Sequence, residues 1–360
     1  MRVLFVTPYF PPETGAAPAR ALHFARALAR AGHEVRVVTG LPNHPAGVIH
    51  PEYRGVRFRS ERVEGVRVDR VWLYATPRKT AWTRLANHLS FALAALPACL
   101  AGPRPEVVLV TTPPLFHALG AWLAARLAGA AFVTDCRDDW PHAAIALGEM
   151  HPGAAARALD ALAHFCQRRA ARILVVTPGM HAQLAARGFE ARRLVDLPNG
   201  ADTGLFRPAA APAARDGRPF TVLYAGTHGL VHGMDALLDA AAALAGEDVR
   251  FRFVGDGVAK PALERAAAAR GLANCEFRPS VPPAELVALL QAADVCVATT
   301  RGDAFAGETI PVKVFDYLAC GRPVVAAVRG DAQRVVEASG GGLVVPPGDG
   351  AAIAAAIRRL

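Results

Sequence analysis

Two carboxylates and one amine lie close together near the end of the 360-residue chain. They are Glu308, Lys313 and Asp316, with Pro311 after the first of them and Gly321 after the last. Proline suits the first turn of a helix and glycine its C-terminal cap, so we expect a helix from Pro311, with Glu308 in the loop before it. A cation at a helix N-terminus opposes the helix dipole, and a bound anion would explain Lys313 there. The cluster matches a sugar-plus-diphosphate ligand; the alternative is a surface pair of Lys313 and Asp316.

Two glycine-containing loops follow expected strands in the same half of the chain. One follows the strand expected at 221–225, and the other is a Gly-Asp-Gly turn after the strand expected at 250–254. Glycines between a strand and a helix let backbone N–H groups approach a phosphate closely. Many loops of α/β proteins contain glycine without binding anything, so each loop alone is weak support. The residues we expect at the ligand are Gly226, Thr227, His228, Gly229 and Gly255.

A similar loop follows the first expected strand, at 3–7. It contains Gly15 among small residues, whose N–H groups could face an anion at the next helix; the alternative is an ordinary Pro/Gly loop. No G-x-G-x-x-G follows that strand, and no G-x-x-x-x-G-K-[ST] occurs in the chain. A dinucleotide oxidoreductase and a P-loop NTPase therefore lose their main support.

Metal-ligand spacing is absent from the sequence. The 6 cysteines and 12 histidines are scattered, with no C-x-x-C and no D-x-D. We therefore expect no metal and no other cofactor, and cysteines that are small buried hydrophobes in a reducing compartment.

Short β-branched runs alternate with Ala/Leu-rich helical stretches along the chain. This alternation predicts the α/β class, with βα units around parallel sheets. The segment 208–219 is rich in proline and alanine without periodicity, so we interpret it as a linker. We expect two Rossmann-like, doubly wound domains, at 1–207 and 220–360. Ligands of such sheets bind outside the carboxyl ends of the strands, which places the expected site in a central cleft that the two domains face.

Several separated motifs carry a resemblance to a known family. The Glu308-x7-acid pattern leads into a helix that ends in A-C-G-R-P-V-V, and L-P-N-G-A-D-T-G-L-F-R-P occupies 197–208. These motifs resemble retaining glycosyltransferases of the GT-B fold, family 4. Four further motifs resemble bacterial sugar transferases of O-antigen and capsule assembly, which transfer fucosamine or another N-acetylamino sugar. They are Y-F-P-P-E-T-G at 9–15, G-L-P-N-H-P at 40–45, T-P-P-L-F at 112–116 and R-D-D-W-P at 137–141.

The resemblance implies roles for particular residues of the C-terminal, nucleotide-sugar-binding domain. Glu308 would hydrogen-bond the donor sugar and brace the developing oxocarbenium ion. Lys313 would neutralise the diphosphate, together with the amides of the 226–229 loop. Asp316 stands where the family usually has Glu for the ribose hydroxyls, and Val281 matches the loop that frames the nucleobase.

In the N-terminal domain the resemblance implies an acceptor site. Asp138 would position or deprotonate the acceptor hydroxyl; the alternative is a local ion pair with Arg137. The implied reaction moves a sugar, expected to be an N-acetylamino sugar, from a UDP-linked donor to a lipid-pyrophosphate-linked or other glycan acceptor. It retains the anomeric configuration and serves cell-surface polysaccharide synthesis.

Two other functions remain open on the sequence. One is a sugar-nucleotide epimerase of the same fold. The other is a non-catalytic sugar-nucleotide-binding partner, suggested because the chain stops within a helix at 357–360, where relatives continue through a C-terminal crossover helix.

The basic excess of the chain is one-sided. The total is +9, but residues 1–200 hold 24 basic and 14 acidic residues, a net charge of +10, and residues 201–360 hold 16 and 17, a net charge of −1. This asymmetry predicts that the N-terminal half meets an anionic surface or substrate; a general bias toward Arg is the alternative. The basic segment 78–84 leads into the apolar stretch 89–101, a pattern compatible with a helix in an anionic membrane interface.

Other partners and compartments are disfavoured. Aromatic residues make up 7% of the chain, and the basic residues form no stacking platform, so we expect no nucleic acid. The longest apolar stretch is too short to span a bilayer, and the N-terminus lacks the pattern of a signal peptide. We expect a cytoplasmic protein, either soluble or peripheral on the inner face of the plasma membrane.

Overall fold

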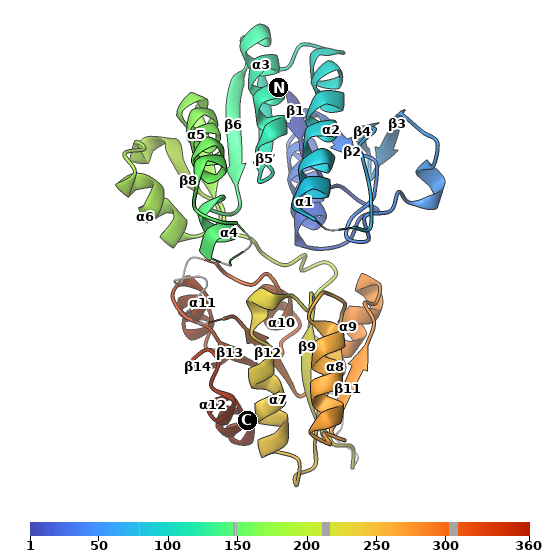
Figure 1. The fold of residues 1–360 in the computed structure, drawn as a ribbon, viewed down its shortest axis with the longest axis vertical. Helices are drawn as coiled ribbons and strands as arrows, with labels where there is room; N and C mark the ends of the chain where they lie inside the picture. The colour runs from blue at the N-terminus through green and yellow to red at the C-terminus, as the bar shows by residue number, and fades with distance from the viewer. Residues whose placement is uncertain (79, 147, 149, 211–216, 302–308) are drawn as a thin grey trace. The chain divides into compact units, whose positions relative to one another are not determined.

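The computed structural model describes residues 1–78, 80–146, 148, 150–210, 217–301 and 309–360 (Figure 1). The described residues form two compact units. The first comprises Met1–Val176 and Met180–Leu197, and the second comprises Thr177–Gly179 and Pro198–Leu360. Each unit contains one sheet with an apolar core on both faces, formed by the side chains of strands and of the helices that cover them.

The first sheet has eight strands, and every described pair is parallel except the pair of β3 and β4 at one edge. In sheet order the strands are β3 (Phe58–Val63), β4 (Val66–Val71), β2 (Glu34–Gly40), β1 (Arg2–Val6), β5 (Val107–Thr112), β6 (Ala131–Cys136), β7 (Arg172–Val175) and β8 (Leu194–Asp196). Buried parallel strands are apolar on both faces, which is why the β-branched runs of the sequence predict them. β3 is a polar edge strand and has no such run, so the sequence did not reveal it.

Helices cover both faces of this sheet (Figure 1). They are α1 (Ala16–Arg30), α2 (Ala81–Leu100), α3 (Phe116–Ala128), α4 (His142–Ala146), α5 (Ala154–Arg169) and α6 (Pro178–Ala186), with the short 3-10 helices η1 (Pro51–Tyr53) and η2 (Ala191–Arg193). α2 packs on α3, whose buried face is mostly alanine. A side chain at Gly120 would contact Leu96, so small residues let these two helices approach closely.

The second sheet has six strands, all parallel in the described residues. In sheet order they are β11 (Cys275–Arg278), β10 (Val249–Val254), β9 (Phe220–Ala225), β12 (Val295–Thr299), β13 (Val324–Ala327) and β14 (Gly342–Val345). The helices between them are α7 (Asp235–Ala243), α8 (Lys260–Ala269), α9 (Pro283–Ala292), α10 (Lys313–Ala319), α11 (Asp331–Ser339) and α12 (Gly350–Arg359), with the 3-10 helix η3 (Leu230–His232).

The second unit begins before the segment interpreted as a linker. Phe206 packs against the core of the second sheet, and Gln291 donates a hydrogen bond to the carbonyl of Arg207 at 2.8 Å. Residues 198–207 therefore belong to the second unit, whereas the sequence placed them in the first domain. Part of the expected linker, 211–216, lies outside the described residues.

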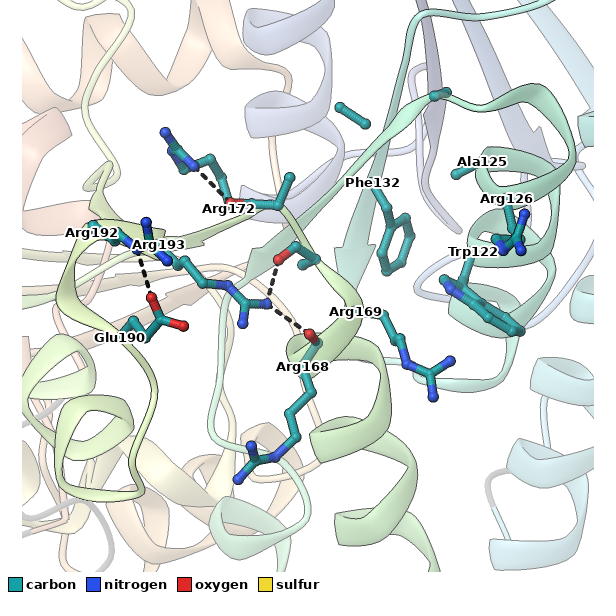
Figure 2. Close-up of a pocket in the computed structure, with 14 residues that line it drawn as sticks. Trp122, Ala125, Arg126, Phe132, Arg168, Arg169, Arg172, Glu190, Arg192 and Arg193 are labelled. Carbon is teal, nitrogen blue, oxygen red and sulfur yellow. Dashed lines mark hydrogen bonds and ion pairs between the residues drawn. The ribbon is translucent and has the colours of Figure 1, made fainter.

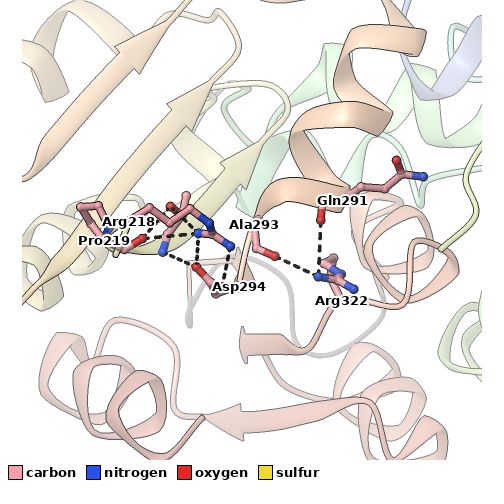
Figure 3. A network of polar contacts seen from close by, with 7 residues as sticks. Arg218, Pro219, Gln291, Ala293, Asp294 and Arg322 are labelled. Carbon is pink, nitrogen blue, oxygen red and sulfur yellow. Dashed lines mark hydrogen bonds and ion pairs between the residues drawn. The ribbon is translucent and has the colours of Figure 1, made fainter. Parts of the chain in front are cut away.

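The chain enters β9 through a fixed polar contact (Figure 3). Arg218 forms two hydrogen bonds with Asp294, of 2.6 and 3.0 Å, and the backbone N–H of Thr221 donates to the same carboxylate at 2.8 Å. Nearby, Arg322 donates to the carbonyl of Ala293 at 3.2 Å, just beyond the end of α9. These contacts register β9 against β12, the two strands at which the site lies.

Candidate active site

The strand order of each sheet reverses beside its first strand. In the second sheet β10 and β11 lie on one side of β9, and β12, β13 and β14 lie on the other. In the first sheet the reversal falls between β1 and β5. Ligands of doubly wound sheets bind at the carboxyl ends of the strands at such a point. A ligand is therefore expected at the loop after β9 in the second unit, and at the loop after β1 in the first.

The loop after β9 packs tightly on the Gly-Asp-Gly turn after β10. A side-chain carbon at Gly255 would lie 1.9 Å from the carbonyl oxygen of Gly226, and one at Gly257 would lie 2.3 Å from that of His228. Both turn glycines also have positive φ. Only glycine fits either position, so the turn is built around the loop beside it.

The loop keeps two of its four backbone N–H groups for its own structure. Gly226 donates to the carbonyl of Val254, and His228 donates to that of Asp256, each at 2.9 Å. The N–H groups of Thr227 and Gly229 make no hydrogen bond with a described residue. Of the four amides expected to face an anion, these two are available to one.

Lys313 reaches this loop from the start of α10. A side-chain carbon at Gly226 would lie 3.0 Å from its Cε and 3.1 Å from its Nζ, so the amine lies against the loop. The Nζ atom is buried and has no hydrogen-bond partner in the described part of the chain. Burial lowers the pKa of Lys313 to about 7. A buried amine without a partner at a topological switch point is well placed to bind an anion.

Two histidines line the same space. His228 is fully buried with neither ring nitrogen bonded to a described group, and Nδ1 of His232 is likewise unbonded. Burial, reinforced by the charges of Lys260 and Lys313, lowers the pKa of His228 to about 4, and burial together with the charge of Lys313 lowers that of His232 to about 3. Both rings are therefore neutral at pH 7, and they add polar atoms without a charge.

Helix α10 is registered against β9 by a buried tyrosine. The hydroxyl of Tyr317 donates to the carbonyl of Ala225 and accepts from its N–H, both at 2.9 Å. This contact fixes Lys313 and Asp316, which lie on the same helix. Burial raises the pKa of Asp316 to about 7, and no described residue forms a hydrogen bond or ion pair with its carboxylate.

The structure brings most of the expected donor-site residues together. Lys313 and the loops containing Gly226 and Gly255 are adjacent, and α10 begins at Lys313, two residues later than expected. The surface pair of Lys313 and Asp316 does not form between these described side chains. Val281 follows β11 and packs on the apolar core of this unit. Glu308 lies outside the described residues.

In the first unit, the loop after β1 is organised around a buried carboxylate. Glu13 is 6% exposed and accepts backbone N–H groups from Phe10 at 3.1 Å, Asn43 at 2.9 Å and His44 at 2.8 Å. Burial raises its pKa to about 7 despite these three bonds. Gly15 follows it with φ 121°, and a side chain there would meet open space. The carboxylate thus ties the loop after β1 to the loop after β2.

Asp138 follows β6 and is exposed. The alternative interpretation, an ion pair with Arg137, does not form between these two described residues, whereas the adjacent Asp139 binds Arg187 through two hydrogen bonds, of 2.8 and 2.9 Å. Of the two neighbouring carboxylates, Asp138 is the one left open to solvent.

A pocket of about 630 Å³ lies at the opposite edge of the first sheet, where β6 and β7 begin (Figure 2). It is lined by six arginines and one acid, Glu190. Arg193 donates to the carbonyls of Gln167 and Arg168 at the end of α5, and Arg169 lies 5.4 Å from the centre of the Trp122 ring. Arginines in the last turn of a helix complement its dipole, so we assign Arg126, Arg168 and Arg169 to ending α3 and α5 and not to catalysis.

Two features of the described residues concern metal ions and membranes. The described residues contain no group of three or more His, Cys, Asp or Glu that could hold a metal ion. None of the helices in the described ranges is both long and apolar enough to span a membrane.

Comparison with known proteins identifies the family. A family model described as a glycosyl transferase 4-like domain matches residues 15–200, and one described as glycosyl transferases group 1 matches residues 219–360. The chain belongs to the glycosyl transferase 4-like family. It is a glycosyltransferase with the GT-B fold, which confirms the family and the fold expected from the sequence motifs.

Relatives of this glycosyltransferase extend over most of its length. A protein of Escherichia coli (strain K12), named as a colanic acid biosynthesis glycosyl transferase, is 29% identical over 310 residues, which are 82% of this chain and 75% of that protein. Sucrose-phosphate synthase from Thermosynechococcus elongatus has a TM-score of 0.74 at 20% identity, with 99% of this chain and 89% of that chain covered. Anabaena HepE in complex with UDP-glucose has a TM-score of 0.72 at 17% identity, with 100% and 89% covered. Both structures share the fold.

Two residues of this glycosyltransferase were missed from its sequence. Lys260 donates to the carbonyls of Gly255 and Arg278 at 2.9 and 2.8 Å, and so holds the turn after β10 in place. Glu13 holds the loop after β1 in place by accepting a hydrogen bond from a backbone N–H group of that loop. Lys260 follows the Gly-Asp-Gly turn closely, a weak signal. Glu13 lies inside the Y-F-P-P-E-T-G motif, where its type was visible and its partners were not.

Proposed function

We propose that this glycosyltransferase retains the anomeric configuration and moves a sugar, of the N-acetylamino class, from a UDP-linked donor to a lipid-linked or other glycan acceptor. The observation that carries the proposal is the unpaired amine of Lys313 beside the loop after β9. The UDP-glucose complex of HepE and the colanic acid name of the Escherichia coli relative support a UDP donor and a cell-surface polysaccharide product.

The proposed donor site acts on charge. When the bond between the anomeric carbon and the phosphate breaks, negative charge develops on the diphosphate. Lys313 and the N–H groups of Thr227 and Gly229 are the described donors available to stabilise it. We propose that these groups replace a metal ion in this role.

The remaining groups take the other parts of the proposed reaction. Glu308 would bind the donor sugar, Asp316 the ribose hydroxyls, and the segment at Val281 the base. Asp138 would orient the acceptor hydroxyl. This hydroxyl attacks the anomeric carbon on the face that the diphosphate leaves, and its proton passes to a phosphate oxygen. One carbon–oxygen bond breaks and one forms on the same face, so the configuration is retained.

The test is to incubate the purified protein with a panel of UDP-sugars and lipid-linked acceptors. We expect acceptor-dependent UDP release, a product of retained configuration by NMR, and loss of transfer in Glu308→Ala. Donor turnover without an acceptor would indicate an epimerase. UDP binding with no transfer to any acceptor would indicate a binding partner. Full activity of Glu308→Ala would overturn the site assignment.

We further propose that α2 docks on an anionic lipid surface, which would bring a lipid-linked acceptor to this unit. Its exposed face is apolar: Trp82 is 79% and Leu93 is 73% exposed, and Leu89 and Leu100 share the face at helical spacing. The helix begins after Thr80, with the basic Arg78 before it. An apolar stripe with basic residues at one end suits the interface of an anionic membrane.

Vesicle flotation tests this docking. We expect the protein to float with vesicles containing phosphatidylglycerol at low salt, and the double variant Trp82→Ser/Leu93→Ser to remain unbound. The matched control is Leu127→Ser, an exposed leucine on α3. Equal flotation of the double variant and the wild type would overturn α2 as the docking face.

A further inference from the structure

An aromatic ring lies directly under the amine of Lys313. The Nζ atom is 3.7 Å from the centre of the Tyr224 ring. Tyr224 lies near the end of β9, is buried, and donates its hydroxyl proton to the carbonyl of Thr227 at 2.8 Å. A cation within about 6 Å of a ring centre and above its face is attracted by the negative charge of that face.

We propose that Tyr224 is a positioning residue whose ring holds the ammonium of Lys313 beneath the loop after β9 until the diphosphate of the donor takes it over. The identity of the anion rests on the proposed function. The position of the Lys313 amine on the ring in the unliganded protein does not depend on that function.

None of the charged groups described around Lys313 forms an ion pair with its amine, so the Tyr224 ring is the described group that attracts it. His228 and His232 are neutral at pH 7, and Lys260 is bonded to two carbonyls and to Asp256. Asp316, on the same helix, forms no ion pair with the amine, and burial has moved its pKa to about 7. No described carboxylate pairs with Lys313.

The backbone around the ring is shaped for the amine. Gly226 has φ 136°, and a side-chain carbon there would come within 3.1 Å of Nζ, so any other residue would displace the lysine. Tyr317 fixes α10 to Ala225, the residue after Tyr224. Ring, loop and helix are therefore registered to one another before any ligand arrives.

A ring suits a temporary position better than a carboxylate does. The attraction of a ring for an ammonium is weaker than that of a doubly charged diphosphate, so the ligand can displace it. A carboxylate partner would neutralise Lys313 and compete with the phosphates. The Oη–Thr227 bond orients the ring and also fixes the loop whose Thr227 N–H is free for the ligand.

Lysine NMR tests the resting position without any ligand. The chain has three lysines, at 79, 260 and 313, so a protein labelled with ¹³C at the lysine Cε gives three signals, assigned with Lys79→Arg and Lys313→Arg. We expect the Lys313 signal upfield of the other two because it lies over the ring, in the wild type and in Tyr224→Phe. In Tyr224→Leu the upfield displacement should vanish, and Lys313 should titrate at a lower pH.

Absence of an upfield signal in the wild type, or its persistence in Tyr224→Leu, would overturn the proposal. If Tyr224→Leu does not fold, the comparison of the wild type with Tyr224→Met takes its place. Addition of UDP then tests the transfer of the amine. The Lys313 signal should move downfield in the wild type and in Tyr224→Phe as the amine leaves the ring, whereas the leucine variant should show no such downfield movement.

A lack of UDP binding by the wild type would overturn the proposed donor and the transfer to diphosphate. The ring-current result would still decide the resting position, so the two failures are distinguishable.

Discussion

Each sheet has a buried ionisable side chain beside the loop that follows its first strand, a carboxylate in the first sheet and an amine in the second. The two groups differ in their hydrogen bonds. Glu13, after the first strand of the first sheet, accepts three backbone N–H groups. Lys313, beside the loop after the first strand of the second sheet, has no hydrogen-bond partner in the described chain and rests on an aromatic ring. A buried charge that is fully hydrogen-bonded belongs to the framework, whereas one left unpaired is held for a ligand.

Lys260 extends the comparison within one unit. It lies in the same sheet as Lys313 and donates to two carbonyls and one carboxylate. Within the second unit, Lys260 is therefore hydrogen-bonded and Lys313 is not, just as Glu13 is hydrogen-bonded in the first unit. Variants of Lys260 and Lys313 thus form a matched pair.

The largest effect is expected on transfer. Lys313→Met should lower kcat by about 10²- to 10³-fold, the usual cost of removing one preorganised donor from a developing negative charge. Initial rates with a saturating UDP-sugar measure it. A loss smaller than about 3-fold would show that Lys313 is not among the groups that stabilise the leaving diphosphate, since it falls far below that range.

The free energy of unfolding should fall most in the variants of Glu13 and Lys260 and least in the variant of Lys313. Glu13→Gln and Lys260→Met each leave buried partners unpaired and should lower the free energy of unfolding of their units by about 1–3 kcal/mol. Lys313→Met removes an unpaired buried charge and should leave stability unchanged or higher. Urea titrations followed by fluorescence and circular dichroism compare the three variants. A destabilisation of Lys313→Met as large as that of Lys260→Met would remove the distinction between them.

Two glycines sharpen the contrast between the loops. Gly226→Ala should push the amine of Lys313 off its position and raise the KM for the donor about 10-fold, a cost of about 1.4 kcal/mol. Gly15→Ala meets no atom within 4 Å and carries only the strain of its positive φ, so its effect on the donor KM should be smaller. Steady-state kinetics with varied donor decide this, and equal effects would contradict a role for the amine.

A last effect is expected on the pH dependence of stability. Because the pKa of Lys313 is lowered to about 7 in the folded unit, the unfolded chain binds more protons than the folded one above pH 7. The contribution of Lys313 to stability should therefore become less unfavourable as pH rises from 7 toward the ordinary lysine value. The stability difference between Lys313→Met and the wild type should shrink between pH 7 and 9. A difference that grows with pH would contradict the lowered pKa.

Local sequence patterns predicted most of the fold because the sequences of buried parallel strands are short apolar runs. β3 was not predicted, because an edge strand of Arg, Ser and Glu has no such run. Lys313 could be predicted because a cation at a helix start is locally unexpected. Tyr224 and Lys260 could not, because their partners come from other strands and loops. The start of α10 was misplaced by two residues because Pro311 suits a first helical turn, yet Val312 is the N-cap.

The most direct test of the central claim is the calorimetric titration of UDP into the wild type and Lys313→Met, with Lys260→Arg as the control that keeps a cation at the turn after β10. The claim is that Lys313 is kept unpaired for a diphosphate. It predicts that Lys313→Met binds UDP at least about 10-fold more weakly, a loss of about 1.4 kcal/mol, with no loss of thermal stability. Equal UDP affinity in the wild type and Lys313→Met would contradict it.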